Sequence, residues 1–225
     1  MLYQDDLELL RRTREETLGL VGGLSEYQCQ FAPTRRLTRI DVLLFPLRVL
    51  SPPGPRWSIG EVLDHLIRFE TAFRRDIETL IALQKSGQSP ELRYGFREIN
   101  VSFAFIPRVF LPLLEIPMSA FSQAIPTVML EYLTSNRILP AQSPDMLAPR
   151  RGRPTRELCQ ELRDSLNASA GMFQTNPSLD YARMFREHPV TGRQNVLQAL
   201  RMIALHEQRH QKQIREIIDE PAFPK

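Results

Sequence analysis

Two of the protein's four histidines, His206 and His210, lie four residues apart near the C-terminal end of the chain. On a helix this spacing corresponds to about 6 Å of rise and about 40° of rotation, so both imidazoles point the same way. The same helical face carries apolar residues, namely Ala199, Met202, Ile203, Ile214 and Ile217. The pattern therefore predicts two imidazoles that face an apolar core.

A third histidine, His65, lies in a similar setting. Its helical face also carries the apolar residues Val62, Leu66, Phe69 and Phe73. Neutral imidazoles in an apolar interior need partners, and three of them from two packed helices can converge on one divalent cation. The alternative is a set of hydrogen-bonded core histidines. The pattern favours a metal site formed by His65, His206 and His210, with coordination positions left for water or substrate.

The segment 206–210 also matches the H-E-x-x-H signature of zinc metalloproteases, in which the glutamate, here Glu207, is the general base. The extended form of that signature requires a glycine and a third histidine, where this chain has Gln213 and Glu216. Only fifteen residues follow His210 in which a downstream ligand could lie. A zinc protease is therefore the less favoured interpretation.

The segment Arg151-Gly152-Arg153-Pro154 contains the Arg-Gly-Arg-Pro core of hooks that bind the DNA minor groove. It occurs once, and the net charge of +3 over 225 residues is small for a nucleic-acid binder. We therefore expect a solvated loop here and no nucleic-acid partner. His188, which precedes Pro189, is also expected in a loop, and the alternative is that it flanks the metal pocket.

The composition is that of a soluble globular protein, with 42% hydrophobic and 24% charged residues. The length of 225 residues suits one well-packed domain, so we expect a single domain over 1–225. Residues 1–8 are acidic and lack the features of an export signal, which predicts a cytoplasmic protein with no membrane partner. Two cysteines are present, and Cys159 lies on a stripe of leucines, which favours a buried free thiol.

Hydrophobic periodicity and capping signals predict four principal helices, near residues 5–24, 58–85, 155–175 and 195–219. Ser58 and Glu61 form a capping box before the second helix, and Asn195 with Gln198 does the same before the fourth. No convincing strand pattern is visible. The predicted fold class is therefore all-α, a four-helix bundle.

Two connecting segments complete this prediction. Residues 25–56 contain several prolines and predict an irregular connector. Residues 87–153 predict a long, largely irregular crossover between the second and third helices, because prolines and charges interrupt its apolar stretch at 99–118. Short helical pieces are expected near 121–133, and the exposed apolar remainder is a candidate dimer surface. A sheet contributed by residues 99–114 would count against this architecture.

Three motifs occur in order along the chain. They are Trp57-Ser58-x-x-Glu61-Val62-x-x-His65-Leu66, His188-Pro189-x-x-Gly192, and His206-x-x-x-His210 followed by Gln213-Ile214. In these motifs the chain resembles the DinB-like (DinB/YfiT-like) family over most of its length. The resemblance implies an up-down-down-up four-helix bundle, commonly a homodimer, that binds a divalent metal, variously nickel, zinc or iron. His65, His206 and His210 match the family's metal-binding positions.

The resemblance also implies a class of activity. Related members resemble thiol-dependent S-transferases and isomerases that use low-molecular-weight thiols, and others are called hydrolases. The expected function is thus a metal-dependent transferase or hydrolase with a small-molecule substrate, with a low-molecular-weight thiol as the candidate. The alternative is a non-catalytic, metal-stabilised structural or interaction module, whose site a fourth protein ligand would close. Four charged residues lie off the histidine stripe, where surface or supporting roles are expected: Glu61, Asp64, Glu207 and Arg209.

Overall fold

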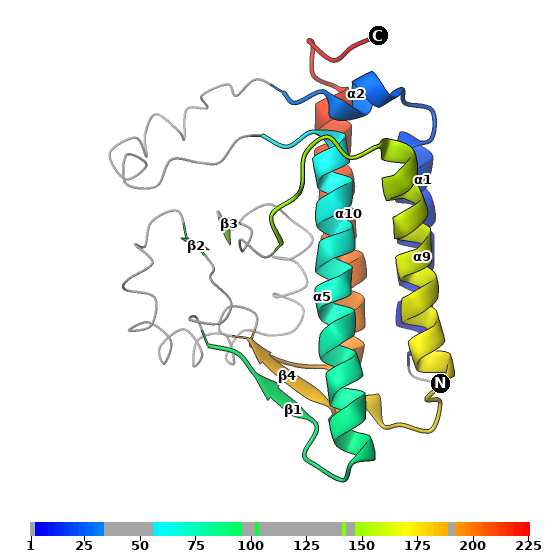
Figure 1. Cartoon of the computed structure of the whole chain (residues 1–225), viewed down its shortest axis with the longest axis vertical. Coiled ribbons are helices and arrows are strands. Elements are labelled where there is room, and N and C mark those ends of the chain that lie inside the picture. Colours follow the sequence, from blue (N-terminus) through cyan, green and yellow to red (C-terminus); the bar gives the residue numbers. More distant parts are fainter. Residues whose placement is uncertain (1–2, 34–55, 96–101, 104–140, 143–146, 189–191) are drawn as a thin grey trace.

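The computed structural model describes residues 3–33, 56–95, 102–103, 141–142, 147–188 and 192–225. The described part is mostly helical, with a small sheet beside one end of the helices (Figure 1). The long helices are α1 (Gln4–Val21), α5 (Ile59–Lys85), α9 (Thr155–Gln174) and α10 (Val196–Ile218). A short helix, α2 (Glu26–Gln30), and a 3-10 turn, η3 (Tyr181–Arg183), join them. The long helices confirm the four segments predicted from the sequence.

Capping side chains fix where the helices begin. Before α5 the backbone N–H of Glu61 donates to Ser58 Oγ over 3.2 Å, and the Ser58 N–H donates to the Glu61 carboxylate over 2.9 Å. Asn195 and Gln198 make the same reciprocal pair before α10, with both distances at 2.9 Å. These bonds satisfy N–H groups that the first helical turn leaves open. Both predicted capping boxes are confirmed.

The four long helices lie side by side. α1 packs against α10 and α9, and α5 packs against α9 and α10. In Figure 1, α1 and α10 run from the lower to the upper end, and α5 and α9 run from the upper to the lower end. The two histidine-bearing helices, α5 and α10, are therefore antiparallel neighbours.

The apolar core consists of two clusters, one near each end of the helices. The sheet-end cluster includes Leu10, Phe73, Phe173, Leu200 and Ala204. The α2-end cluster includes Val21, Leu63, Ile67, Leu158, Leu162 and Ile214. On each long helix, buried polar residues lie in sequence between the two clusters: Thr13, Arg14 and Thr17 on α1, Glu70 on α5, Ser165 and Ser169 on α9, and Glu207, His210 and Gln211 on α10. The core thus has a polar layer in its middle.

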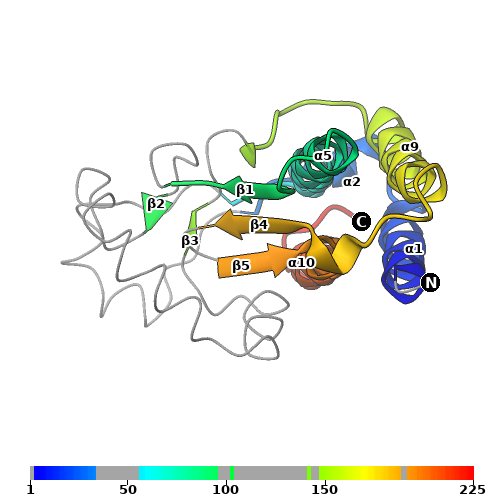
Figure 2. The same ribbon diagram turned by 90° about the horizontal axis from the view of Figure 1, so that it is seen from below.

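A small sheet corrects the all-α prediction. It contains β1 (Glu91–Arg93), β4 (Phe185–His188) and β5 (Gly192–Asn195) in the order β1-β4-β5. β1 pairs parallel to β4, β4 pairs antiparallel to β5, and the sheet lies against the lower end of α5 and α10 (Figure 2). Strands of three or four residues are too short to show a periodic pattern, and β1 finds its partner more than ninety residues away.

Two further expectations change. Residues 25–56 are not wholly irregular, because Ser25 and Gln28 form a capping box that begins α2. β2 (Ser102–Phe103) pairs antiparallel with β3 (Ala141–Gln142), so residues 99–114 do contribute one two-residue strand, contrary to the expected absence of a sheet there. Apart from these residues, the expectations for 99–118 and 121–133 lie outside the described part of the chain.

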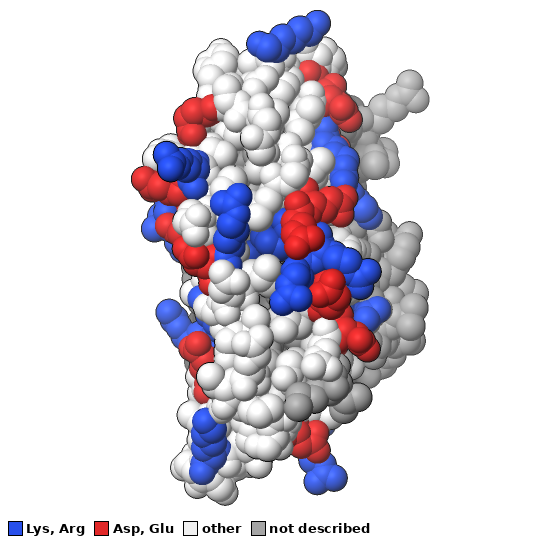
Figure 3. Space-filling view, turned by 90° about the vertical axis from the view of Figure 1, so that its right-hand side faces the viewer, with Lys and Arg blue, Asp and Glu red and all other residues white. Residues whose placement is uncertain are grey.

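Charges of both signs are interspersed on the face that α1 and α9 present (Figure 3). Exposed ion pairs of the described residues include Arg11 with Glu8 and Arg215 with Glu16. Among the described residues, no helix combines the length and the hydropathy that a membrane crossing requires.

Candidate metal centre

Three imidazoles meet between α5 and α10. His65 projects from α5, and His206 and His210 project from successive turns of α10. One ring nitrogen from each lies within 4.8 Å of the other two. Nε2 of His65 and Nε2 of His206 are 3.0 Å apart. The structure therefore brings together the three histidines that the sequence singled out.

Two of the rings are oriented by their outer nitrogens. His65 Nδ1 lies 2.8 Å from the carbonyl oxygen of Leu147, and His210 Nδ1 lies 2.9 Å from Oε1 of Gln213. Both oxygens can only accept, so both Nδ1 atoms carry the proton. In the neutral rings this leaves a lone pair on each Nε2. Either a proton on His206 or a cation must then lie between the two Nε2 atoms that are 3.0 Å apart.

Aromatic rings close two sides of the cluster. Phe69 stacks on His206, with ring centroids 3.8 Å apart and an interplanar angle of 13°. Trp57 lies near-parallel to His210 at 6.1 Å and tilted against His65 at 4.8 Å. These rings restrict rotation of the imidazoles and lower the local dielectric.

Burial keeps the imidazoles of His65 and His206 neutral. The side chain of His65 is almost wholly buried, and this burial lowers its pKa to about 4, although the bond to Leu147 partly offsets the effect. Burial lowers the pKa of His206 well below its ordinary value, and the neighbouring His210 and His65 lower it further. Neutral rings are the form that binds a metal.

A buried carboxylate next to His65 holds the segment that contacts its ring. Asp64 is fully buried and accepts the backbone N–H of Arg150 over 2.8 Å. It also accepts side-chain bonds from Arg150 at 3.0 Å and Arg153 at 2.9 Å. Because Leu147 lies three residues before Arg150, these bonds tie down the carbonyl that orients His65.

The Arg-Gly-Arg-Pro segment is engaged in ion pairs within the protein. Arg151 Nε bonds the carboxylate of Glu61 over 2.9 Å, and Arg153 bonds both Asp64 and Glu161. Glu61 and Asp64 are therefore not surface residues, because both are buried and ion-paired. They act as supports for the loop that precedes α9.

Glu207 does not face the histidines. It is 1% exposed, and its carboxylate binds the guanidinium of Arg14 on α1 through bonds of 2.9, 2.9 and 3.1 Å. A zinc protease would need this carboxylate beside the metal as a general base. The structure removes that interpretation of the H-E-x-x-H segment, and it corrects any surface role for Glu207.

His188 stands apart from the three-histidine group. It is the last residue of β4 and pairs with Gly192, so it lies in a strand and not in the expected loop. Burial lowers its pKa to about 3. Both cysteines are free thiols, with Cys29 buried and Cys159 half-buried, and burial raises the pKa of each. A raised pKa disfavours the thiolate that a nucleophile requires.

The geometry fits a divalent metal. Two nitrogen ligands at about 2.1 Å from an ion lie about 3.0–3.4 Å from each other in octahedral or tetrahedral geometry. The 3.0 Å between Nε2 of His65 and Nε2 of His206 lies in this range. All three ligand nitrogens lie within 4.8 Å of one another, so small ring movements would bring them to the spacing that a shared ion requires. Among the described residues, the group holds no fourth histidine, cysteine or carboxylate.

These features define a class, a mostly helical protein whose three-histidine group could hold a metal ion. The family model of the DinB superfamily matches the chain over residues 9–214, and the protein belongs to that superfamily. Comparisons with curated proteins and with solved structures gave no match.

The sequence did not lead us to two groups that orient the histidine rings, the Leu147 carbonyl and the Gln213 side chain. The Leu147 carbonyl lies 82 residues from His65 in sequence, and no local pattern announces it. The link from His210 to Gln213 had a visible signal, because residues three apart on a helix are neighbours.

Proposed function

We propose that the protein is a divalent-metal-binding member of its superfamily in which His65, His206 and His210 are the ligands. The observation that carries the proposal is the convergence of three ring nitrogens within 4.8 Å, from the buried His65 and His210 and the half-buried His206. The rings of His65 and His210 hold their protons on the opposite nitrogen. Chemically different outer partners, a carbonyl and an amide, direct two lone pairs to one point. Such outer partners are typical of metal-ligating histidines.

The donor set bears on which metal binds. Neutral imidazoles suit zinc, nickel and ferrous iron, whereas magnesium and calcium prefer oxygen ligands. We propose one of these three transition metals as the cofactor.

We further propose that the bound metal serves an enzyme with a small-molecule substrate. A divalent cation supplies Lewis acidity, which polarises a substrate and lowers the pKa of a thiol or water. Trp57 and Phe69 would exclude water and shape an apolar wall, and Asp64 would keep His65 in place through the segment 147–150. Thiol-dependent transfer and hydrolysis are the two candidate reactions, and a low-molecular-weight thiol is the candidate substrate.

The alternative is a metal-stabilised structural or interaction module. It would be favoured by a fourth protein ligand that completes the coordination shell. We favour the open site, because the histidine group contains three members among the described residues.

Several broader features belong to the same proposal. The antiparallel packing of α5 with α10 and the helix directions in Figure 1 support an up-down-down-up four-helix bundle. We propose that the chain is a single domain over 1–225 with an insertion at about 87–153, that it forms a homodimer, and that it acts in the cytoplasm without nucleic-acid or membrane partners.

Metal analysis of protein purified without a histidine tag tests the proposal. The expected result is about one equivalent of zinc, nickel or iron per chain, which chelation removes and titration restores. A thermal-shift screen with small thiols and electrophiles would then separate the two functional classes, since only an open site binds them through the metal. Protein that neither retains nor takes up any of these metals would refute the proposal.

A further inference from the structure

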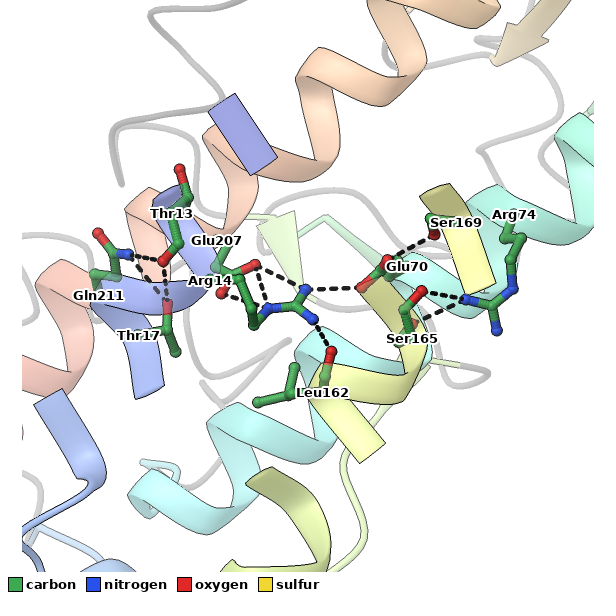
Figure 4. A network of polar contacts seen from close by, with 10 residues as sticks. All are labelled: Thr13, Arg14, Thr17, Glu70, Arg74, Leu162, Ser165, Ser169, Glu207 and Gln211. Atoms are coloured by element: carbon green, nitrogen blue, oxygen red, sulfur yellow. Dashed lines mark hydrogen bonds and ion pairs between the residues drawn. The ribbon is translucent and has the colours of Figure 1, made fainter. Parts of the chain in front are cut away.

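A charged network crosses the core in the layer of the histidines. It joins all four long helices through Arg14 on α1, Glu70 on α5, Glu207 on α10 and the α9 residues Leu162 and Ser169 (Figure 4). The side chains of Arg14, Glu70 and Glu207 are at most 1% exposed. Buried charges of this kind are costly unless each finds its partners.

Arg14 is the centre of the network. Its Nε and Nη2 donate to both oxygens of Glu207, at 2.9 Å each for the two shortest bonds. Nη2 also donates to Glu70 over 2.7 Å, and Nη1 donates to the carbonyl of Leu162. The second oxygen of Glu70 accepts the hydroxyl of Ser169 over 2.7 Å. One guanidinium thus holds a carboxylate from each of the two histidine-bearing helices.

These two carboxylates are close in sequence to the histidines. Glu207 directly follows His206 on α10, and Glu70 follows His65 by five residues on α5. Because a helix is rigid over one or two turns, the position of each carboxylate along the helix axis fixes the position of the histidine on the same helix. Because Arg14 binds both carboxylates, it fixes the position of His65 along the bundle relative to that of His206.

Apolar packing alone does not supply this constraint. Cores of the right volume accept rearranged packing and lose uniqueness before they lose stability. A slip of α10 by one turn, about 5.4 Å, would remove Glu207 from Arg14 and leave a buried charge unpaired. The network therefore penalises every register but the one that brings the histidines together.

We infer that Arg14 is a positioning residue for the metal site, acting through Glu70 and Glu207 on the relative register of α5 and α10. This inference deepens the proposed function and rests on it. The hydrogen bonds of Arg14 go to Glu70, Glu207 and Leu162, so its effect on the metal is through helix placement. A comparable role for a buried polar group is known from coiled coils, where one polar residue specifies register.

The test replaces the whole network by apolar side chains, in the triple variant Arg14→Met, Glu70→Leu, Glu207→Leu. Exchange of a buried charged triad for apolar residues of similar volume preserves folding in known cases. The variant is loaded with cobalt(II), and its affinity, the visible spectrum of the bound ion and the apoprotein's helicity and melting temperature are measured. We expect retained helicity, an affinity lower by about tenfold or more, and an altered spectrum, because the three nitrogens no longer meet in one arrangement.

Gln211→Met is the matched control. Gln211 is buried, directly follows His210, and bonds Thr13 and Thr17, so it links α10 to α1 but not to α5. We expect it to lower the melting temperature while its cobalt affinity stays within about twofold of wild type. If the triple variant does not fold, Arg14→Lys replaces it. This variant keeps the charge but loses the fork that holds two carboxylates, so we expect about threefold weaker binding or more.

The outcomes are distinct. Wild-type affinity and spectrum in a folded triple variant would overturn the inference, as would wild-type affinity in Arg14→Lys if that variant has to be used. An equal loss of affinity in Gln211→Met would also overturn it, because the effect would then follow stability alone. Failure of the wild-type protein to bind cobalt, zinc, nickel or iron would instead overturn the proposed function itself.

Discussion

His206 and Glu207 are neighbours on α10, yet they lie in two different regions of the same polar layer. The Glu207 side carries fixed charges, and its acceptors and donors are joined in a closed network with Arg14 and Glu70. The histidine side carries neutral rings whose lone pairs converge. Both regions lie in the core, but only the second directs ring nitrogens from three side chains toward one another.

This difference separates a structural role from a binding role. In the first region the polar groups satisfy each other, so ligand binding there would require breaking bonds that are already made. In the second region, a cation could take the place of the proton between Nε2 of His65 and Nε2 of His206 and be bound by ring nitrogens of all three histidines.

Single replacement of His65, His206 or His210 by alanine should abolish stoichiometric metal. Each change removes one of three ligands from a site with no spare histidine among the described residues. Metal content after gel filtration is the measurement, and the melting temperature in the presence of metal should fall as well. His188→Ala is the control and should retain metal, because His188 lies outside the group. Full metal content in all three ligand variants would contradict the account.

Glu207→Ala should destabilise the protein by about 3–5 kcal/mol, because it leaves the buried cation of Arg14 with one carboxylate where it had two. In the wild type, burial by itself lowers the pKa of Arg14, but Glu207 and Glu70 outweigh this effect and raise it overall. In the variant Arg14 stays charged because a guanidinium does not lose its proton in proteins. The free energy of unfolding from urea titration of the metal-free protein measures the loss. If Glu207 were instead a solvent-facing general base, its removal would not lower the free energy of unfolding. Unchanged stability of Glu207→Ala would therefore contradict the structural role of Glu207.

Stability of the metal-free protein should decrease as the pH falls from about 6.5 to about 4. The pKa of His65 is lowered to about 4 in the fold, so between these values the unfolded chain binds a proton that the folded chain does not. The contribution of His65 is complete above pH 6.5 and is lost on acidification, by about 1.4 kcal/mol per pH unit. Urea midpoints at several pH values should therefore converge for wild type and His65→Ala at low pH. Parallel curves would show that His65 is not buried and neutral.

The same shift revises the pH dependence expected for binding. An ordinary imidazole would lose metal as the pH falls below about 6.5. With the pKa of His65 lowered to about 4 and that of His206 also lowered, protons compete with the metal only in more acidic solution.

Asp64→Asn should weaken metal binding by about tenfold, the smallest of these effects. The change removes the charge that holds Arg150 and Arg153 and so loosens the Leu147 carbonyl that orients His65. Isothermal titration with zinc measures the affinity. Glu161→Gln is a control, because it weakens only the exposed partner of Arg153. Equal effects of the two variants would show that Asp64 has no specific role.

The sequence was sufficient for the parts of the fold that local patterns determine. The four long helices and both capping boxes follow from periodicity and from residues three apart, and the inward direction of the three histidines follows from their apolar neighbours. α2 had a readable signal in Ser25 and Gln28 that the prolines after it obscured.

The remaining features depend on contacts between distant segments. The pairing of β1 with β4 and the bond from Leu147 to His65 join residues more than eighty positions apart. The two carboxylate partners of Arg14 are 56 and 193 residues away from it in the sequence. A helical pattern shows which side chains face inward, and it does not show which ones meet there.

Diffraction from crystals of the metal-loaded protein, recorded on both sides of the absorption edge of the bound metal, would locate the ion relative to His65, His206 and His210. The account predicts one anomalous peak per chain, within about 2.0–2.2 Å of Nε2 of His65 and of a ring nitrogen of His206 and His210, with at least one coordination position not filled by protein. A peak elsewhere, or no peak in crystals grown with excess zinc or nickel, would contradict it.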